Sequence, residues 1–98
     1  VLQTLEVFFV NFGEYEERYI MPMLSELRSK GVSSEIYPTA GKMKKQMSYA
    51  NSKGVRYVVL VGTNEIQTGQ VSVKDMNTAS QKEMNFKQFL DIFSNSET

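Results

Sequence analysis

The chain contains no cysteine and no histidine. Their absence excludes disulfide bonds, thiolate or imidazole metal sites, and catalysis by a Ser-His-Asp or Cys-His arrangement within these 98 residues. Long apolar runs are missing as well, because the longest run near the start, Val7-Phe8-Phe9-Val10, is far too short to span a bilayer. No basic segment precedes it, as a signal peptide would require. We expect a domain with no membrane contact, no metal site and no catalytic residue of its own.

The length fits one small domain. A chain of 98 residues can bury roughly two-thirds of the surface that it exposes when unfolded. Because the chain opens on Val1-Leu2-Gln3 rather than on Met, we expect residues 1–98 to be one domain cut from a longer protein. A function that needs more than one domain would then be only partly visible.

Net charge is also absent, since 11 basic residues balance 11 acidic ones. The charges are nevertheless uneven along the chain. Residues 1–35 carry six acids against three bases, and residues 65–98 carry five acids against three bases. The segment 36–64 has no acid and five bases, which are Lys42, Lys44, Lys45, Lys53 and Arg56. A local positive field is therefore predicted in a neutral chain.

The first sixty residues alternate between apolar strands and amphipathic helices. Strands are predicted at 5–10, 32–37 and 56–61, and helices between them at 13–31 and 42–53. Pro22 lies inside the first helix and predicts a kink or a break there. In the second helix, the spacing of Met43, Met47 and Ala50 predicts the buried face. This order of elements predicts parallel strands joined by right-handed crossovers.

The tetrapeptide Ser-Lys-Gly-Val occurs twice, at 29–32 and at 52–55. Each copy ends a predicted helix and precedes a predicted strand. The Lys faces the negative end of the helix dipole, and the Gly can adopt the left-handed conformation that ends many helices. We interpret the repeat as a structural stop signal used twice, although a record of ancient duplication stays open.

The pattern changes after Gly62. Residues 63–68 are polar, and the alternation of residues 71–75 predicts a half-exposed antiparallel strand. A return strand is predicted at 80–84, across a turn at Asn77-Thr78-Ala79. Asn85 and Gln88 resemble a capping box for a last helix. The buried face of that helix would consist of Phe86, Phe89, Leu90 and Phe93.

The second helix holds the most informative candidate site. A helical projection groups several side chains into a stripe about 80° wide, opposite the predicted buried face. The stripe consists of Lys42, Lys45, Tyr49 and Lys53, with Gln46 at its edge and Lys44 on the other flank. Cations beside an aromatic ring suit a phosphate backbone with an unpaired base. An ordinary solvated helix surface remains the alternative.

Two other motifs point to no chemistry. The segment "GKMKKQ" lacks the second glycine and the Lys-Ser/Thr ending of a phosphate-binding loop, and no glycine-rich dinucleotide fingerprint follows the first strand. Glu14, Glu16 and Glu17 could form a metal or acid-base cluster. Acids in a first helical turn are explained by the helix dipole alone, so we interpret them as a solvated face.

The stretch "GKMKKQMSYANSKGVRYVVLVGTNEIQTGQVSVKDMNT" at 41–78 resembles the C-terminal anticodon-binding domain of class II aminoacyl-tRNA synthetases, specifically that of histidyl-tRNA synthetases. Four elements agree with that family in order and spacing: a Lys-x-Lys-Lys-Gln helix, a Tyr-Val-Val strand ending in Gly, a Glu-x-x-x-Gly turn and a Val-x-Val-Lys-Asp strand. The resemblance covers nearly the whole chain, loosely before Val32 and closely from Gly41 to Asp75.

The resemblance implies a three-layer α/β/α fold with a five-stranded mixed sheet flanked by three helices. It also implies that the domain, without a cofactor of its own, grips the anticodon stem-loop of tRNA(His). A separate catalytic domain, absent here, would activate histidine with ATP and Mg²⁺ and charge the tRNA. The parent would be a cytoplasmic histidine–tRNA ligase that dimerises through this catalytic domain.

Positions that face RNA are implied by the same resemblance, residue by residue. They are Lys42, Lys44, Lys45 and Gln46 on the second helix, Glu65 in the turn after the third strand, and Lys74 in the next strand, and the helical stripe adds Tyr49. The chain departs from the family at Thr78-Ala79-Ser80-Gln81, where Thr-Gly-Glu-Gln is common, so the turn type there is open.

Two other classes of function stay open. One is a synthetase-like regulatory module that senses uncharged tRNA, which the neighbouring domain would reveal. The other is a small flavodoxin-like enzyme or ligand-binding domain, which would need a cofactor at the carboxyl ends of its strands. The missing phosphate loop and the missing histidine count against this second class.

Overall fold

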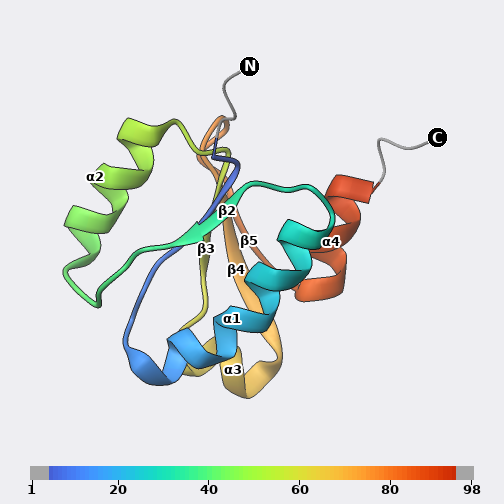
Figure 1. Cartoon of the computed structure of the whole chain (residues 1–98), viewed down its shortest axis with the longest axis horizontal. Coiled ribbons are helices and arrows are strands. Elements are labelled where there is room, and N and C mark those ends of the chain that lie inside the picture. Colours follow the sequence, from blue (N-terminus) through green and yellow to red (C-terminus); the bar gives the residue numbers. More distant parts are fainter. Residues whose placement is uncertain (1–4, 95–98) are drawn as a thin grey trace.

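The computed structural model describes residues 5–94, which form three layers around a central sheet (Figure 1). The strands are β1 (Val7–Phe9), β2 (Ser34–Ile36), β3 (Tyr57–Leu60), β4 (Gln70–Asp75) and β5 (Gln81–Asn85). The helices are α1 (Glu14–Ser29), α2 (Met43–Lys53), α3 (Thr63–Thr68) and α4 (Phe86–Ser94). In Figure 1, α2 covers one face of the sheet, α1 and α4 cover the other, and α3 lies at one end beside the first turn of α1.

The sheet has the order β2-β1-β3-β4-β5. β1 pairs in parallel with both β2 and β3, whereas β4 and β5 are antiparallel to their neighbours. From β1 the chain passes through α1 to β2 on one side, and α2 then carries it back to β3 on the other side. The winding therefore changes direction between β1 and β3. The predicted α/β fold with a five-stranded mixed sheet is confirmed.

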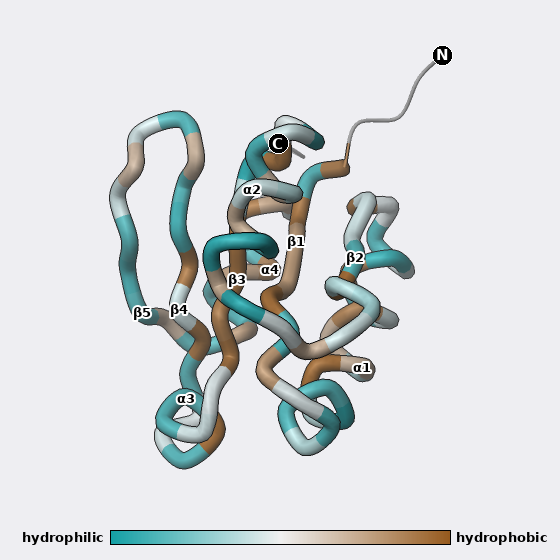
Figure 2. Tube along the Cα trace, turned by 90° about the vertical axis from the view of Figure 1, so that its left-hand side faces the viewer, coloured by the Kyte–Doolittle hydropathy of each residue, from teal (hydrophilic) through white to brown (hydrophobic). Residues whose placement is uncertain are grey.

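The core is divided between the two faces of the sheet, because successive side chains of a strand point to opposite sides. Phe8 packs with Ala50 and Val58 beneath α2. Val7 and Phe9 join the larger cluster beneath α1 and α4, which includes Leu24, Leu27 and Phe89. All three residues of β1 are fully buried, as the unbroken apolar run predicts. Figure 2 shows these strands as a hydrophobic centre, with the hydrophilic β5 at the margin.

Two expectations about helices are wrong. Residues 5–94 form four helices rather than three, since the polar segment after Gly62 forms the short helix α3 and ends at Gly69, whose φ is 76°. Of the predicted kink or break at Pro22, the break does not occur, because α1 runs without interruption through it. Pro22 is exposed, so the carbonyl that loses its intrahelical partner there can be hydrated.

Both copies of Ser-Lys-Gly-Val end a helix, as predicted. Gly31 and Gly54 have φ angles of 81° and 67°. The amide of the following Val donates back to the helix in each copy: Val32 to the carbonyl of Leu27 at 3.0 Å, and Val55 to that of Ala50 at 3.3 Å. This is the bonding of a Schellman motif. The repeat is therefore a structural signal.

The C-terminal part follows the predicted hairpin and helix. Asn85 and Gln88 form the predicted capping box, in which each side chain accepts the other residue's backbone N–H, at 2.8 and 2.9 Å. At the hairpin turn, Ala79 stands where the family that the chain resembles commonly has Gly. Ala79 adopts a φ of 63°, which favours glycine. The turn is therefore left-handed at the position where the family commonly has Gly.

Candidate nucleic-acid interface

Three lysines gather where α2 begins, and we call Lys42, Lys44 and Lys45 the lysine turn. Lys42 precedes the helix in an extended conformation, with φ −66° and ψ 137°. The first turn of α2 contains no acidic residue. Within residues 5–94 the ion pair present is Arg18–Glu14, so none of the three lysines forms an ion pair with a described acid. Their charge adds to the positive end of the helix dipole.

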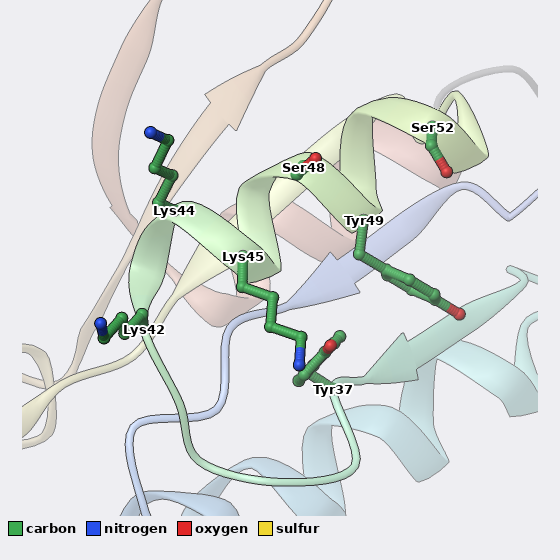
Figure 3. A pocket seen from close by; sticks show the side chains of 7 residues that line it. All are labelled: Tyr37, Lys42, Lys44, Lys45, Ser48, Tyr49 and Ser52. Atoms are coloured by element: carbon green, nitrogen blue, oxygen red, sulfur yellow. The ribbon is translucent and has the colours of Figure 1, made fainter.

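The lysine turn borders an open cavity of about 570 Å³ on the outer side of α2 (Figure 3). The cavity is lined by Tyr37, Lys42, Lys44, Lys45, Ser48, Tyr49 and Ser52. Figure 3 shows the side chain of Lys45 pointing toward Tyr37, whereas Lys42 and Lys44 point away from it. The helical projection placed Lys42 in one stripe with Lys45 and Tyr49. All three residues line the cavity, although Lys42 is the N-cap of α2 and its side chain does not follow the helical projection.

Tyr49 is half-buried and belongs to an aromatic cluster. Its ring centroid lies 5.5 Å from that of Phe8 and 5.3 Å from that of Tyr37. The hydroxyl donates to Oε1 of Glu35 at 3.1 Å, and Lys53 Nζ lies 5.7 Å from the ring centroid. Burial, followed by the contact with Glu35, raises the pKa of Tyr49. The hydroxyl therefore stays protonated at neutral pH, and protein already covers part of the ring.

Gln46 is fully buried, so the expectation that it faces RNA is wrong. Its Oε1 accepts the backbone N–H of Asn11 at 2.7 Å, and its Nε2 donates to the carbonyl of Asn11 at 2.9 Å and to that of Gly41 at 3.2 Å. A buried backbone group needs a hydrogen-bond partner, and no other strand pairs with Asn11 in this position. Gln46 therefore serves the fold, as a bridge from α2 to the end of β1.

This bridge also explains the orientation of α2. The predicted face placed Met43 in the core, but Met43 is 39% exposed, while Gln46 and Ala50 are buried and Met47 is half-buried. The helix is rotated so that Gln46 reaches Asn11. In the buried face of α2, Gln46 thus takes the place predicted for Met43. Its side-chain amide makes the two hydrogen bonds to the backbone of Asn11 that a neighbouring strand would otherwise make.

Glu65 lies in the first turn of α3, at the carboxyl end of β3. Its Oε1 accepts the N–H of Gly62 at 2.9 Å, which caps the helix. A Cβ added to Gly62 would lie only 3.2 Å from this oxygen, so glycine leaves room for the carboxylate. The other oxygen, Oε2, accepts no hydrogen bond from residues 5–94. Oε1 therefore stabilises the fold, and Oε2 can accept a hydrogen bond from a ligand.

Lys74 lies on the same face of the sheet as α2. It is paired with Val58 in the antiparallel ladder, and Val58 packs beneath α2. Cross-strand partners point to the same face. Ser72, two residues earlier, also lies on this face and accepts a hydrogen bond from Gln81 Nε2 at 2.9 Å. Beyond α2, this face is polar and extends along β4 and β5.

Three residues near these sites are not predicted by the sequence analysis. Tyr37 follows a short strand, and only the fold brings it beside Lys45. Asn11 is a single polar residue after an apolar run, a weak signal for a buried hydrogen-bonding group. Phe12 is a large apolar side chain that is 43% exposed. Its place between a strand and a glycine could have marked it as a loop aromatic.

No three acidic, histidine or cysteine side chains in residues 5–94 are grouped so that they could hold a metal ion. None of the helices in this part of the chain has the length and hydropathy to cross a membrane.

Comparison with known proteins gives a consistent answer. The family described as "Anticodon binding domain" matches residues 6–96. The histidine–tRNA ligase of Phocaeicola vulgatus is 50% identical over 76 residues, which are 78% of this chain and 17% of that protein. The chain therefore spans about a sixth of the length of this curated relative.

Two solved structures are also similar. The apo histidyl-tRNA synthetase of S. aureus has a TM-score of 0.83 and 26% identity, over 92% of this chain and 23% of that chain. The histidyl-tRNA synthetase of Nostoc sp. PCC 7120 has a TM-score of 0.86 over 98% of this chain and 23% of that one. At 21% identity, this second likeness concerns the fold alone.

Proposed function

The chain belongs to the anticodon-binding domain family, and we propose that it binds the anticodon loop of tRNA(His) as one domain of a histidine–tRNA ligase. Family membership supports RNA binding. The identity with histidine–tRNA ligases supports the choice of amino acid. The domain itself does no chemistry in this proposal, and its role is to hold and identify the tRNA.

The lysine turn is the observation that carries the proposal. Cations at the beginning of a helix are unfavourable, because they face the positive end of the helix dipole. Lys42, Lys44 and Lys45 therefore reduce the stability of the free domain, and a phosphate bound among them would remove this repulsion. In the proposed complex, Lys42 and Lys45 contact phosphates, and Lys44 and Lys74 add positive charge on the same side of the sheet. Tyr49 offers the exposed part of its ring to a base.

Glu65 is proposed to read one base. A carboxylate offers only acceptors, which suit the N1–H and N2–H₂ donors of an unpaired guanine. Its Oε2 is available, and it lies at the carboxyl ends of the strands, where open α/β sheets place their binding crevices. In this arrangement, the phosphate contacts of the lysine turn provide affinity, and the base contact of Glu65 provides specificity.

The remaining parts of the activity belong to the rest of the proposed ligase. Residues 1–98 would be one domain of it, and its first four and last four residues lie outside the described part. A catalytic domain would bind histidine and ATP with Mg²⁺, transfer histidine to the tRNA in the cytoplasm, and form the homodimer contact. The described residues have no role in these steps beyond presenting the tRNA.

Glu65→Gln in the full-length ligase tests the proposed function. Gln keeps the shape and the acceptor for Gly62 N–H, but it removes the charge and adds a donor. Binding to matched hairpins that differ in one anticodon base should lose about 1–3 kcal/mol of discrimination between guanine and adenine at one position. Glu26→Gln, at an exposed carboxylate of α1 on the other side of the sheet, is the matched control and should change nothing. If all hairpins respond equally to Glu65→Gln, the base-reading role is excluded.

A further inference from the structure

Phe12 lies where the sheet changes its winding direction. It follows β1, and Gly62 follows the parallel neighbour β3. The connection from β1 leads to one side of the sheet, and β3 lies on the other side. Open α/β sheets bind ligands in the crevice at such a switch point, at the carboxyl ends of the strands. At this place the chain carries a phenyl ring that is 43% exposed.

The loop that carries Phe12 is fixed in place by the residue before it. All hydrogen-bonding groups of Asn11 are used: the backbone N–H and carbonyl bind Gln46, Nδ2 donates to the carbonyl of Tyr37 at 2.8 Å, and Oδ1 accepts from Gly13 N–H at 2.9 Å. Asn11 is only 1% exposed. The ring of Phe12 is therefore held at the surface by a rigid backbone, and little freedom would be lost when a ligand binds it.

The ring lies next to the carboxylate that is proposed to read a base. A Cβ placed on Gly62 would be 3.9 and 4.0 Å from two ring carbons of Phe12 and 3.2 Å from Oε1 of Glu65. Phe12 and Glu65 therefore flank the same glycine. An aromatic face beside a group that only accepts hydrogen bonds fits an unpaired base with donors on its edge.

The charges around Phe12 decide which part of a nucleotide can lie there. Thr63 Oγ1 donates to Oε2 of Glu16 at 3.3 Å, and Asn11 Nδ2 lies 3.4 Å from Oε1 of Glu17. With Glu65, these side chains place three carboxylates near Phe12, at this end of the sheet. They would repel a phosphate, but they do not oppose a neutral base.

We propose that Phe12 is a stacking platform for the base whose edge meets Glu65. This inference rests on the proposed function, because it requires that an anticodon loop reaches this end of the sheet. The lysine turn would hold the backbone of the loop, and Gln46 would act through Asn11 as a positioning residue for the ring. Phe12 gives affinity for a base without sequence preference, and Glu65 adds the preference.

The test uses the full-length ligase and anticodon hairpins that carry a fluorescent guanine analogue, quenched by stacking, at each anticodon position in turn. Phe12→Leu keeps the apolar volume but removes the aromatic face. At one position it should abolish the quenching, and it should weaken binding about 5- to 100-fold, the range for loss of a stacking aromatic. Since no phosphate contact is lost, the slope of log Kd against log salt should not change.

Phe12→Tyr restores an aromatic face and should keep both the quenching and the affinity. Tyr19→Leu is the matched control, because Tyr19 is 40% exposed on α1 and lines a cavity with Pro22 and Phe86 on the side covered by α1 and α4, so it should leave both unchanged. Unfolding midpoints of all variants show whether a loss of binding reflects folding. Quenching that persists in Phe12→Leu, with or without a loss of affinity, overturns the proposal.

Failure of the proposed function has a different signature. If the unmodified ligase binds all hairpins alike whatever their anticodon, both proposals fail together. If it discriminates among anticodons and Phe12→Leu behaves like the unmodified protein, only the role of Phe12 is lost.

Discussion

The two longer helices of the domain end in the same way and begin in opposite ways. α1 and α2 both close with Ser-Lys-Gly-Val and the same pair of backbone hydrogen bonds. At their beginnings, α1 carries Glu14, Glu16 and Glu17 in its first turn, whereas α2 carries the lysine turn and no acid. The dipole favours the first arrangement and disfavours the second. Where the helices agree, the sequence serves the fold, and where they differ, we infer that it serves RNA binding.

The two beginnings are physically connected. Gln46, in the first turns of α2, holds the backbone of Asn11, and Asn11 Oδ1 holds the amide of Gly13, which precedes α1. The basic surface of one helix and the acidic surface of the other are therefore fixed relative to each other. Four predictions test this contrast, from the largest expected effect to the smallest.

Gln46→Ala should break the connection. It leaves the buried N–H and carbonyl of Asn11 without partners, so we expect the free energy of unfolding to fall by about 2–4 kcal/mol. Chemical denaturation measures this change. Gln88→Ala is the control, since Gln88 also binds a backbone amide but is exposed, and its loss should be smaller, at about 1 kcal/mol. Equal losses in the two variants would contradict the bridging role of Gln46.

Replacing both Lys42 and Lys45 with Ala should weaken binding to many RNA hairpins alike, by about tenfold at physiological salt. Each replacement should lower the slope of log Kd against log salt by roughly 0.7–0.9, because each removes one phosphate contact. Lys53→Ala, at the other end of α2, is the matched control. An unchanged slope in both single variants would show that these lysines do not contact phosphates.

Gly31→Ala and Gly54→Ala should each destabilise the domain by about 1 kcal/mol, since both residues have positive φ angles. An added Cβ meets no atom within 4 Å at either position, so backbone strain is the only cost. The two effects should be equal, and neither should change RNA affinity. If the two variants lose different amounts of unfolding free energy, beyond the measurement error, the two helix ends are not equivalent.

Lys44→Glu should have opposite effects on stability and on binding. An acid in the first turn of α2 should raise the free energy of unfolding by about 0.3–1 kcal/mol, while RNA binding weakens. Glu14→Lys is the mirror change on α1 and should lower stability by a similar amount. A Lys44→Glu variant that is both less stable and weaker in binding would indicate a fold defect instead.

Features that depend on neighbours in sequence could be predicted, and features that depend on distant partners could not. The two Gly stops, the capping box at Asn85 and the buried first strand follow from local patterns. Gln46 was placed at the surface because its partner, Asn11, lies 35 residues away in the chain. The orientation of Lys42 was missed because a helical projection treats a residue before the helix as part of it.

Prediction of the candidate site from the sequence has the same limit, because part of the site depends on residues that are distant in the chain. The sequence contained a signal for α3, with Glu65 three residues after Gly62 and Gly69 at its end, but this signal was interpreted as a turn. Phe12 has no periodic pattern around it, and its importance depends on the strand order. Only when β1 and β3 are known to be parallel neighbours do Phe12 and Glu65 come together.

The two outer strands of the sheet determine how this domain can meet a partner. β2 has three residues with the exposed Glu35 in its centre, and β5 carries the exposed Lys82 and Glu83 side by side. Short strands and charged side chains at an edge discourage the pairing of another strand. The unpaired backbone N–H and C=O groups of these edges are thus hindered from pairing with strands of other copies of the chain. Partners must dock through side chains and loops, which suits the irregular surface of a folded RNA better than an extended peptide.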